Sequence, residues 1–151
     1  MKIRMVAAAL LAASATLLAT SPANALDYTG KDPYKSGCAR SARVLKTADL
    51  ITYADKKDVG DVKLMWSSTC KTSWGEVEVS PQADVSILVA TDLKERGKTS
   101  YVKLKKGRGG RHWGPMLSVL RGRCTYAWAE ARTGSYAKDV GLGDTDMVCR
   151  R

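Results

Sequence analysis

The sequence contains no phenylalanine and only one histidine, His112. The aromatic part of a core must therefore come from four tryptophans and six tyrosines, whose polar tips need a partner or water when buried. There is also no Cys-x-x-Cys pair, so the usual ligand pattern of a zinc site is missing. We expect neither a metal nor a cofactor.

The first 25 residues lack cysteine, and all four cysteines lie in the 126 residues that follow. Lys2 and Arg4 precede a run rich in Ala and Leu, which leads to the small-x-small sequence Ala23-Asn24-Ala25. This arrangement predicts a signal peptide, residues 1–25, cleaved after Ala25. Its apolar run is too short to span a membrane. We expect residues 26–151 to form a single secreted β-rich domain, free or held at the cell surface, with no transmembrane span.

The cysteine spacing favours two disulfides in an oxidising compartment. Cys38, Cys70, Cys124 and Cys149 are separated by 32, 54 and 25 residues. Four cysteines allow three pairings. We expect Cys38–Cys70 and Cys124–Cys149, because these pairs close two local loops, and each would destabilise the unfolded chain by about 3–4 kcal/mol.

Apolar residues alternate over short stretches that are separated by Gly, Pro, Asp and Ser, which is typical of β-strands. The predicted strands are 42–47, 50–53, 62–66, 74–79, 86–89, 101–104, 116–120 and 126–131. Such a set predicts a mainly β fold, either a small sandwich or a partly open barrel. Alanine is abundant in 126–132, so a helix is an alternative there.

Two stretches are similar at an offset of 54 residues. The matching pairs are Gly60/Gly114, Cys70/Cys124, Trp74/Trp128 and Glu76/Glu130. Unless the similarity is chance, it predicts two related hairpins, 62–66 with 74–79 and 116–120 with 126–131. We expect each tryptophan to pack over its disulfide in the core. We expect each glutamate to have a structural role, such as a cross-strand ion pair, rather than to form the acid/base pair of a glycosidase.

Positive charge is concentrated in residues 94–123, which we call the basic segment. It contains ten Lys or Arg residues and one acid, Glu95, and so carries +9. The whole chain carries +10, of which Lys2 and Arg4 supply two, so the mature chain carries +8 and its remainder −1. The glycine-rich centre, residues 107–112, is not a P-loop, but glycine amides beside arginines can hold an anion.

Four basic residues and one tryptophan of this segment are the candidate binding residues. We expect Lys105, Lys106, Arg108 and Arg111 to contact an anion, with Trp113 stacking on a sugar or base. Candidate partners are an anionic cell-wall polymer, lipid head groups and extracellular nucleic acid, and such binding weakens steeply with salt. The alternative is a solvated hairpin tip that only keeps the protein soluble.

No motif nominates a catalytic residue, because a Gly-x-Ser-x-Gly sequence is absent and the cysteines are assigned to disulfides. We therefore expect a non-enzymatic binding module. One alternative is a small secreted hydrolase resembling a ribonuclease, in which His112 works with Glu76 or Glu130 and an arginine. Another is an inhibitor of a second secreted protein.

Part of the chain resembles a known family. The sequence Asp32-Pro33-Tyr34-Lys35-Ser36-Gly37-Cys38 is followed by Leu64-x-Trp66-Ser67 and by Cys70-x-x-x-Trp74. These motifs resemble the actinobacterial secreted family called domain of unknown function 2690, over Leu26 to about Val79. The resemblance implies an exported domain, but no activity and no catalytic residue. The family usually has Ala and a basic residue after the tryptophan, where this chain has Gly75-Glu76.

Overall fold

The computed structural model describes residues 27–81, 109–119, 123–134 and 139–149, and the backbone of 86–93 and 98–105. A short 3-10 helix, η1 (Cys38–Ser41), leads into β1 (Ala42–Thr52), β2 (Asp58–Ser67), β3 (Thr72–Val79), β4 (Ser86–Leu93) and β5 (Lys98–Lys105). These are followed by β6 (Gly110–Trp113), β7 (Leu117–Ser118), β8 (Cys124–Arg132), β9 (Val140–Asp144) and β10 (Val148–Cys149). The predicted signal peptide lies outside the described residues.

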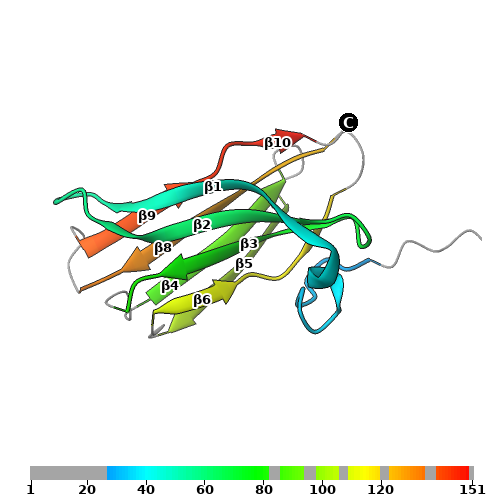
Figure 1. Cartoon of the computed structure of the whole chain (residues 1–151), viewed down its shortest axis with the longest axis horizontal. Helices are drawn as coiled ribbons and strands as arrows, with labels where there is room; N and C mark the ends of the chain where they lie inside the picture. The colour runs from blue at the N-terminus through cyan, green and yellow to red at the C-terminus, as the bar shows by residue number, and fades with distance from the viewer. Residues whose placement is uncertain are drawn as a thin grey trace, which may run out of the picture.

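The strands form one antiparallel sheet that does not close (Figure 1). Its order is β5-β4-β8-β9-β1-β2-β3-β6, with β10 added to β8 and β7 added to β3. The mainly β fold is thus confirmed, and the alternative of a helix at 126–132 is wrong, because β8 is a strand throughout. Within the described part of the chain, no helix has the length and apolar character needed to span a membrane.

The sheet folds over so that β2 and β3 lie across β4 and β8 (Figure 1). Val62, Leu64 and Val77 contribute to the core from one side. Three alanines of β8 contribute from the other side: Ala127, Ala129 and Ala131. Their small side chains alternate with half-buried residues along β8, as expected for a strand with one face on a core.

Strand β1 is a single strand, although the sequence pattern predicts two. Its register with β2 shifts between Val44 and Lys46 and again between Asp49 and Ile51. Each shift interrupts the alternation of apolar and polar residues, which makes one continuous strand look like two in the sequence.

The first predicted hairpin is confirmed, whereas the second is wrong. Strands β2 and β3 pair continuously from Gly60↔Val79 to Ser67↔Thr72. The described part of that stretch, residues 116–119, contributes β7, which pairs with β3, whereas β8 pairs with β4, β9 and β10. Met116 is apolar for another reason: it is buried under the N-terminal segment, residues 27–41, and exchanges backbone hydrogen bonds with Gly30 and Lys31.

Both expected disulfides are present, with S–S distances of 2.06 Å for Cys38–Cys70 and 1.99 Å for Cys124–Cys149. Cys38 is buried in a cluster with Met65, Trp74 and Met116, so Trp74 packs by its disulfide as expected. Trp128 does not match it: the indole is half-buried on the face of β8 that points away from the alanines. The two parts of the repeat therefore have different environments.

The basic segment forms both free edges of the sheet. Strands β5 and β6 are the two ends of the strand order, and only residues 106–109 connect them. The five Cα–Cα steps from Lys105 to Gly110 span at most about 18 Å, so the end of β5 and the start of β6 must lie within that distance of each other. A Cβ on Gly109 would lie 2.4 Å from the Ser80 carbonyl oxygen, so the residue directly before β6 packs against the backbone that follows β3.

The two disulfides should differ in their accessibility to reductant. Cys38 is 1% exposed, whereas Cys149 is exposed at the end of β10, which pairs with β8 over only two residues. Under limited reduction of the folded protein followed by alkylation, we expect peptides with Cys124 and Cys149 to be labelled first. Equal labelling of both pairs in the folded protein, as in a denatured control, would contradict the described burial.

Candidate functional site

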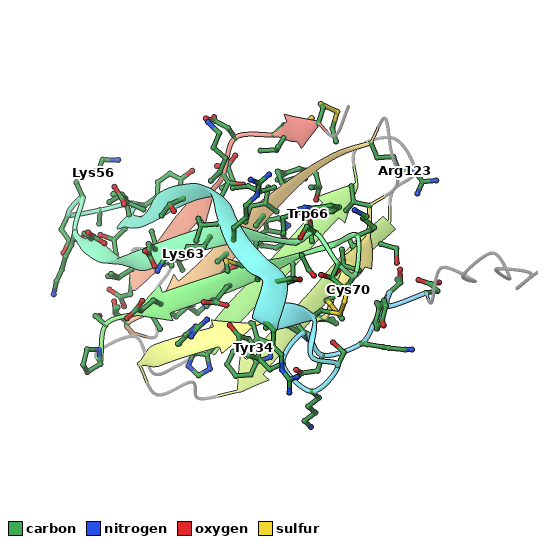
Figure 2. The ribbon with its side chains drawn as sticks, turned by 45° about the vertical axis from the view of Figure 1, so that its right-hand side comes forward. Tyr34, Lys56, Lys63, Trp66, Cys70 and Arg123 are labelled. Carbon is green, nitrogen blue, oxygen red and sulfur yellow. A yellow bond between two sulfur atoms is a disulfide. The ribbon has the colours of Figure 1, made fainter. Side chains whose placement is uncertain are left out.

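The structure describes only part of the predicted anion-binding set. Lys105 is the last residue of β5, and Lys106 and Arg108 lie outside the described residues. Arg111 and Trp113 are two residues apart in β6, where they pair with Glu78 and Glu76 of β3. Arg123, near the end of the basic segment, lies well apart from Tyr34 and β6 (Figure 2). The basic residues therefore do not all share one surface.

Arg111 is held by a buried carboxylate, that of Glu76. The Arg111 Nε donates to Glu76 Oε1, and its Nη2 donates to the Tyr34 hydroxyl oxygen. The Tyr34 hydroxyl donates in turn to Glu76 Oε2 at 2.7 Å. The Glu76 side chain is 5% exposed and that of Arg111 is 52% exposed. Both carboxylate oxygens thus have a donor, as a buried charge requires.

Asp32 and Trp113 complete this arrangement, which we call the Glu76 cluster (Asp32, Tyr34, Glu76, Arg111 and Trp113). Asp32 Oδ1 accepts from the amides of Tyr34 and Lys35, at 2.8 and 2.9 Å, and Oδ2 accepts from Trp113 Nε1 at 3.1 Å. The Tyr34 and Trp113 ring centroids are 4.4 Å apart. Figure 2 shows Tyr34 beside β6, where the N-terminal segment crosses the sheet. The cluster fixes that segment to an edge strand.

The cluster shifts the titration of its members. Burial, together with the hydrogen bond to Glu76 and its charge, raises the pKa of Tyr34 to about 12. The hydrogen bond to Glu76 raises the pKa of Arg111, although burial opposes it. Burial acts to raise the pKa of Asp32, but hydrogen bonds from the Lys35 amide, the Trp113 indole and the Tyr34 amide outweigh it and lower the pKa overall. Tyr34 is therefore neutral and Arg111 charged at neutral pH.

A row of acidic residues crosses the neighbouring strands on the same face. Asp49 pairs with Asp61, and Asp61 pairs with Glu78. Lys63 lies among them on β2 (Figure 2), with its Nζ 3.2 Å from Asp61 and 3.3 Å from Glu78. The described residues contain no group of three His, Cys, Asp or Glu side chains placed to hold a metal ion. The lysine offsets part of the repulsion between these carboxylates.

The described contacts do not assemble the parts of a ribonuclease or glycosidase. His112 lies between Arg111 and Trp113 in β6 and pairs with Val77, so strand alternation directs it away from the Glu76 side. Glu130 pairs with Arg132 at 2.8 Å on the outward face of β8, in the other layer from Glu76. Both glutamates form ion pairs, as expected. Only that of Glu76 joins two strands, however, and the two carboxylates do not face one site.

The fold and the cluster define a disulfide-linked β-sheet domain whose N-terminal segment is fixed to an edge strand by polar contacts. The chain belongs to the family described as "Protein of unknown function (DUF2690)", whose model matches residues 26–128. The resemblance inferred from the motifs is confirmed. The match extends beyond Val79 and includes every residue of the Glu76 cluster.

The chain is also similar to a curated protein, "Uncharacterized protein YjfA" of Bacillus subtilis (strain 168). The identity is 32% over 126 residues, which cover 72% of this chain and 80% of that protein. No solved structure matches the chain. Neither the family description nor the relative's name states an activity.

Replacing Arg111 should leave Glu76 as a buried carboxylate with one donor fewer. We expect Arg111→Gln to lower the free energy of unfolding by about 2–3 kcal/mol, because a buried charged acceptor loses its partner. The double variant Glu76→Gln/Arg111→Gln should recover most of this loss, because no charge is then buried. Urea denaturation at pH 7 measures both effects.

Arg132→Gln is the matched control, since Arg132 pairs with the less buried Glu130. We expect it to cost less than about 1 kcal/mol, as for exposed ion pairs. Equal losses for the two arginine variants would show that the burial of Glu76 is not what makes Arg111 important.

Tyr34 should titrate late, near pH 12. Absorbance at 295 nm should show one tyrosine ionising near pH 12, and this late phase should be missing in Tyr34→Phe. Because the folded-state pKa lies above the ordinary value of about 10, the contribution of Tyr34 to stability is complete below pH 10 and is lost as pH rises towards 12. Wild type should therefore lose stability more steeply over this range than Tyr34→Phe.

Proposed function

We propose that this protein is an exported, non-enzymatic binding module that engages an anionic polymer outside the cell through the basic segment. The observation that carries the proposal is the position of that segment. It supplies both free edges of the sheet, β5 and β6, together with the connection between them. Eight of its ten Lys and Arg residues, from Lys94 to Arg111, thus belong to the stretch of sequence that contains these two strands.

Export is supported by three features. The sequence begins with the pattern of a signal peptide, and the family match starts at Leu26, where the predicted mature chain begins. Both pairs of cysteines are at disulfide distance, which is consistent with an extracellular location.

The predicted contact residues do not play equal parts in this proposal. Lys105 is the last residue of β5, and Lys106 and Arg108 belong to the sequence that connects β5 to β6, so we take these three as the primary contacts. Arg111 and Trp113 come next in the sequence, in β6, and are also members of the Glu76 cluster. An anionic cell-wall polymer is the partner we favour, because it surrounds an exported protein. Lipid head groups and extracellular nucleic acid are the other outcomes of a binding test.

Lysines on edge strands have another known use, which is to prevent edge-to-edge association of sheets. A binding role and a protective role differ in one measurable respect. Binding requires that particular charges contact the polymer, and so it predicts a strong salt dependence that is lost with those charges. Protection predicts instead that their removal promotes self-association.

Removal of the three primary contacts should weaken polymer binding. We expect Lys105→Gln/Lys106→Gln/Arg108→Gln to elute from immobilised heparin and polyphosphate at lower salt than wild type. The slope of log affinity against log salt should also be shallower, because fewer counterions are released. Parallel measurements with anionic vesicles and with RNA would separate the possible partner classes.

The control triple variant is Arg43→Gln/Lys56→Gln/Lys57→Gln, which removes the same charge from exposed positions outside the basic segment. It should retain most of the affinity and nearly the wild-type slope. Binding that is unchanged in the first triple variant, or reduced equally in both, would refute the proposal. Light scattering of the first variant would then test the protective role.

A further inference from the structure

We propose that Glu76 is an internal competitor for Arg111, so that an anionic ligand must displace the Glu76–Arg111 ion pair to bind the guanidinium through its Nε and Nη2 donors. The inference rests on the proposed function and concerns the regulation of the same surface. It assigns to one buried acid a role in limiting how tightly the basic segment binds.

Arg111 is exposed to solvent, but its contacts within the protein leave only some of its hydrogen-bond donors for a ligand. Its side chain is 52% exposed, so a ligand can reach it from solvent. Nevertheless, Nε is bonded to Glu76 and Nη2 to Tyr34, and the guanidinium carbon lies 5.2 Å from the Tyr34 ring centroid. A ligand therefore meets an arginine whose charge is already matched and whose donors are partly used.

The burial of Glu76 makes it a strong competitor. At 5% exposure its carboxylate is shielded from water and salt, so the pair is screened less than a surface pair. The Tyr34 hydroxyl holds the other carboxylate oxygen in place at 2.7 Å. When Arg111 moves to a ligand, Glu76 loses one of its two donors while it stays buried. This cost is subtracted from the binding energy.

Displacement of Arg111 would also loosen the N-terminal segment. The Arg111 contacts with Tyr34 would be lost, while Asp32 would keep its bond to Trp113. The Cys38–Cys70 disulfide would hold the segment near the sheet in either state. The cluster therefore has a closed state with Arg111 on Glu76 and an open state with Arg111 on the ligand. Ligands favour the open state only by their extra contacts with it.

Glu78 provides a matched control on the same strand and face. It is two residues from Glu76, but its side chain is 64% exposed and it pairs with Lys63 at 3.3 Å. Glu76→Gln and Glu78→Gln each remove one negative charge from β3. A general effect of charge, including the attraction of Glu78 for its cross-strand neighbour Arg111, would therefore appear in both variants. Loss of the direct hydrogen-bonded contact with Arg111 would appear only in Glu76→Gln.

The experiment measures the affinity of folded variants for heparin and for polyphosphate at a fixed ionic strength. We expect Glu76→Gln to bind at least about tenfold more tightly than Glu78→Gln, because a buried carboxylate no longer loses a donor when Arg111 moves to the ligand. In an Arg111→Gln background, replacing Glu76 should give no more gain than replacing Glu78. Equal affinity of the two single variants would overturn the inference, while salt-dependent binding by wild type would leave the proposed function standing. Absence of binding by wild type and all variants would instead overturn the proposed function.

A measurement on the wild type covers the case in which Glu76→Gln does not fold. The Arg111 Nε–H resonance can be followed by 15N NMR while sodium tripolyphosphate is added. We expect this resonance to move away from its position in the closed pair as the anion binds. An Arg111 signal that stays fixed while resonances of other basic residues shift would overturn the inference.

Discussion

The burial of the Glu76 carboxylate is the constraint on which this end of the molecule depends. A carboxylate at 5% exposure needs donors for both oxygens, and they come from two distant parts of the chain, Tyr34 and Arg111. Satisfying one side chain therefore fixes the N-terminal segment, strand β3 and the edge strand β6 relative to one another. The nearby Cys38–Cys70 disulfide makes part of that arrangement covalent.

The same constraint links stability to the chemistry of the surface. Arg111 belongs to the basic segment and, through Glu76, to the packing of the sheet. A residue with both roles cannot be optimised for either one alone. The segment thus contains one positive charge, that of Arg111, which a buried carboxylate already balances. Because Glu76 balances Arg111, the positive charge that a ligand meets at β6 is smaller than the segment's net charge of +9 suggests.

Local patterns in the sequence predict much of this fold, but not the cluster. Alternating residues identify β3 and β8, and loop length identifies the disulfide pairs. The prediction of a second hairpin is wrong because Met116 and Leu117 are buried by the N-terminal segment and β3, not by pairing with β8. The Glu76 cluster joins residues 42 and 77 positions apart in the sequence. No short motif predicts such contacts, because they form only when the N-terminal segment and β6 pack beside β3.

The close passage of Gly109 along Ser80 and Pro81 has a consequence for how relatives of this chain can differ. A side chain at position 109 would overlap with that backbone. The residue before β6 and the segment that follows β3 therefore cannot change independently. A homologue with a larger residue at this position must also displace or lengthen the connection that follows β3. Sequence variation at these two places should therefore be correlated, although they lie some thirty residues apart.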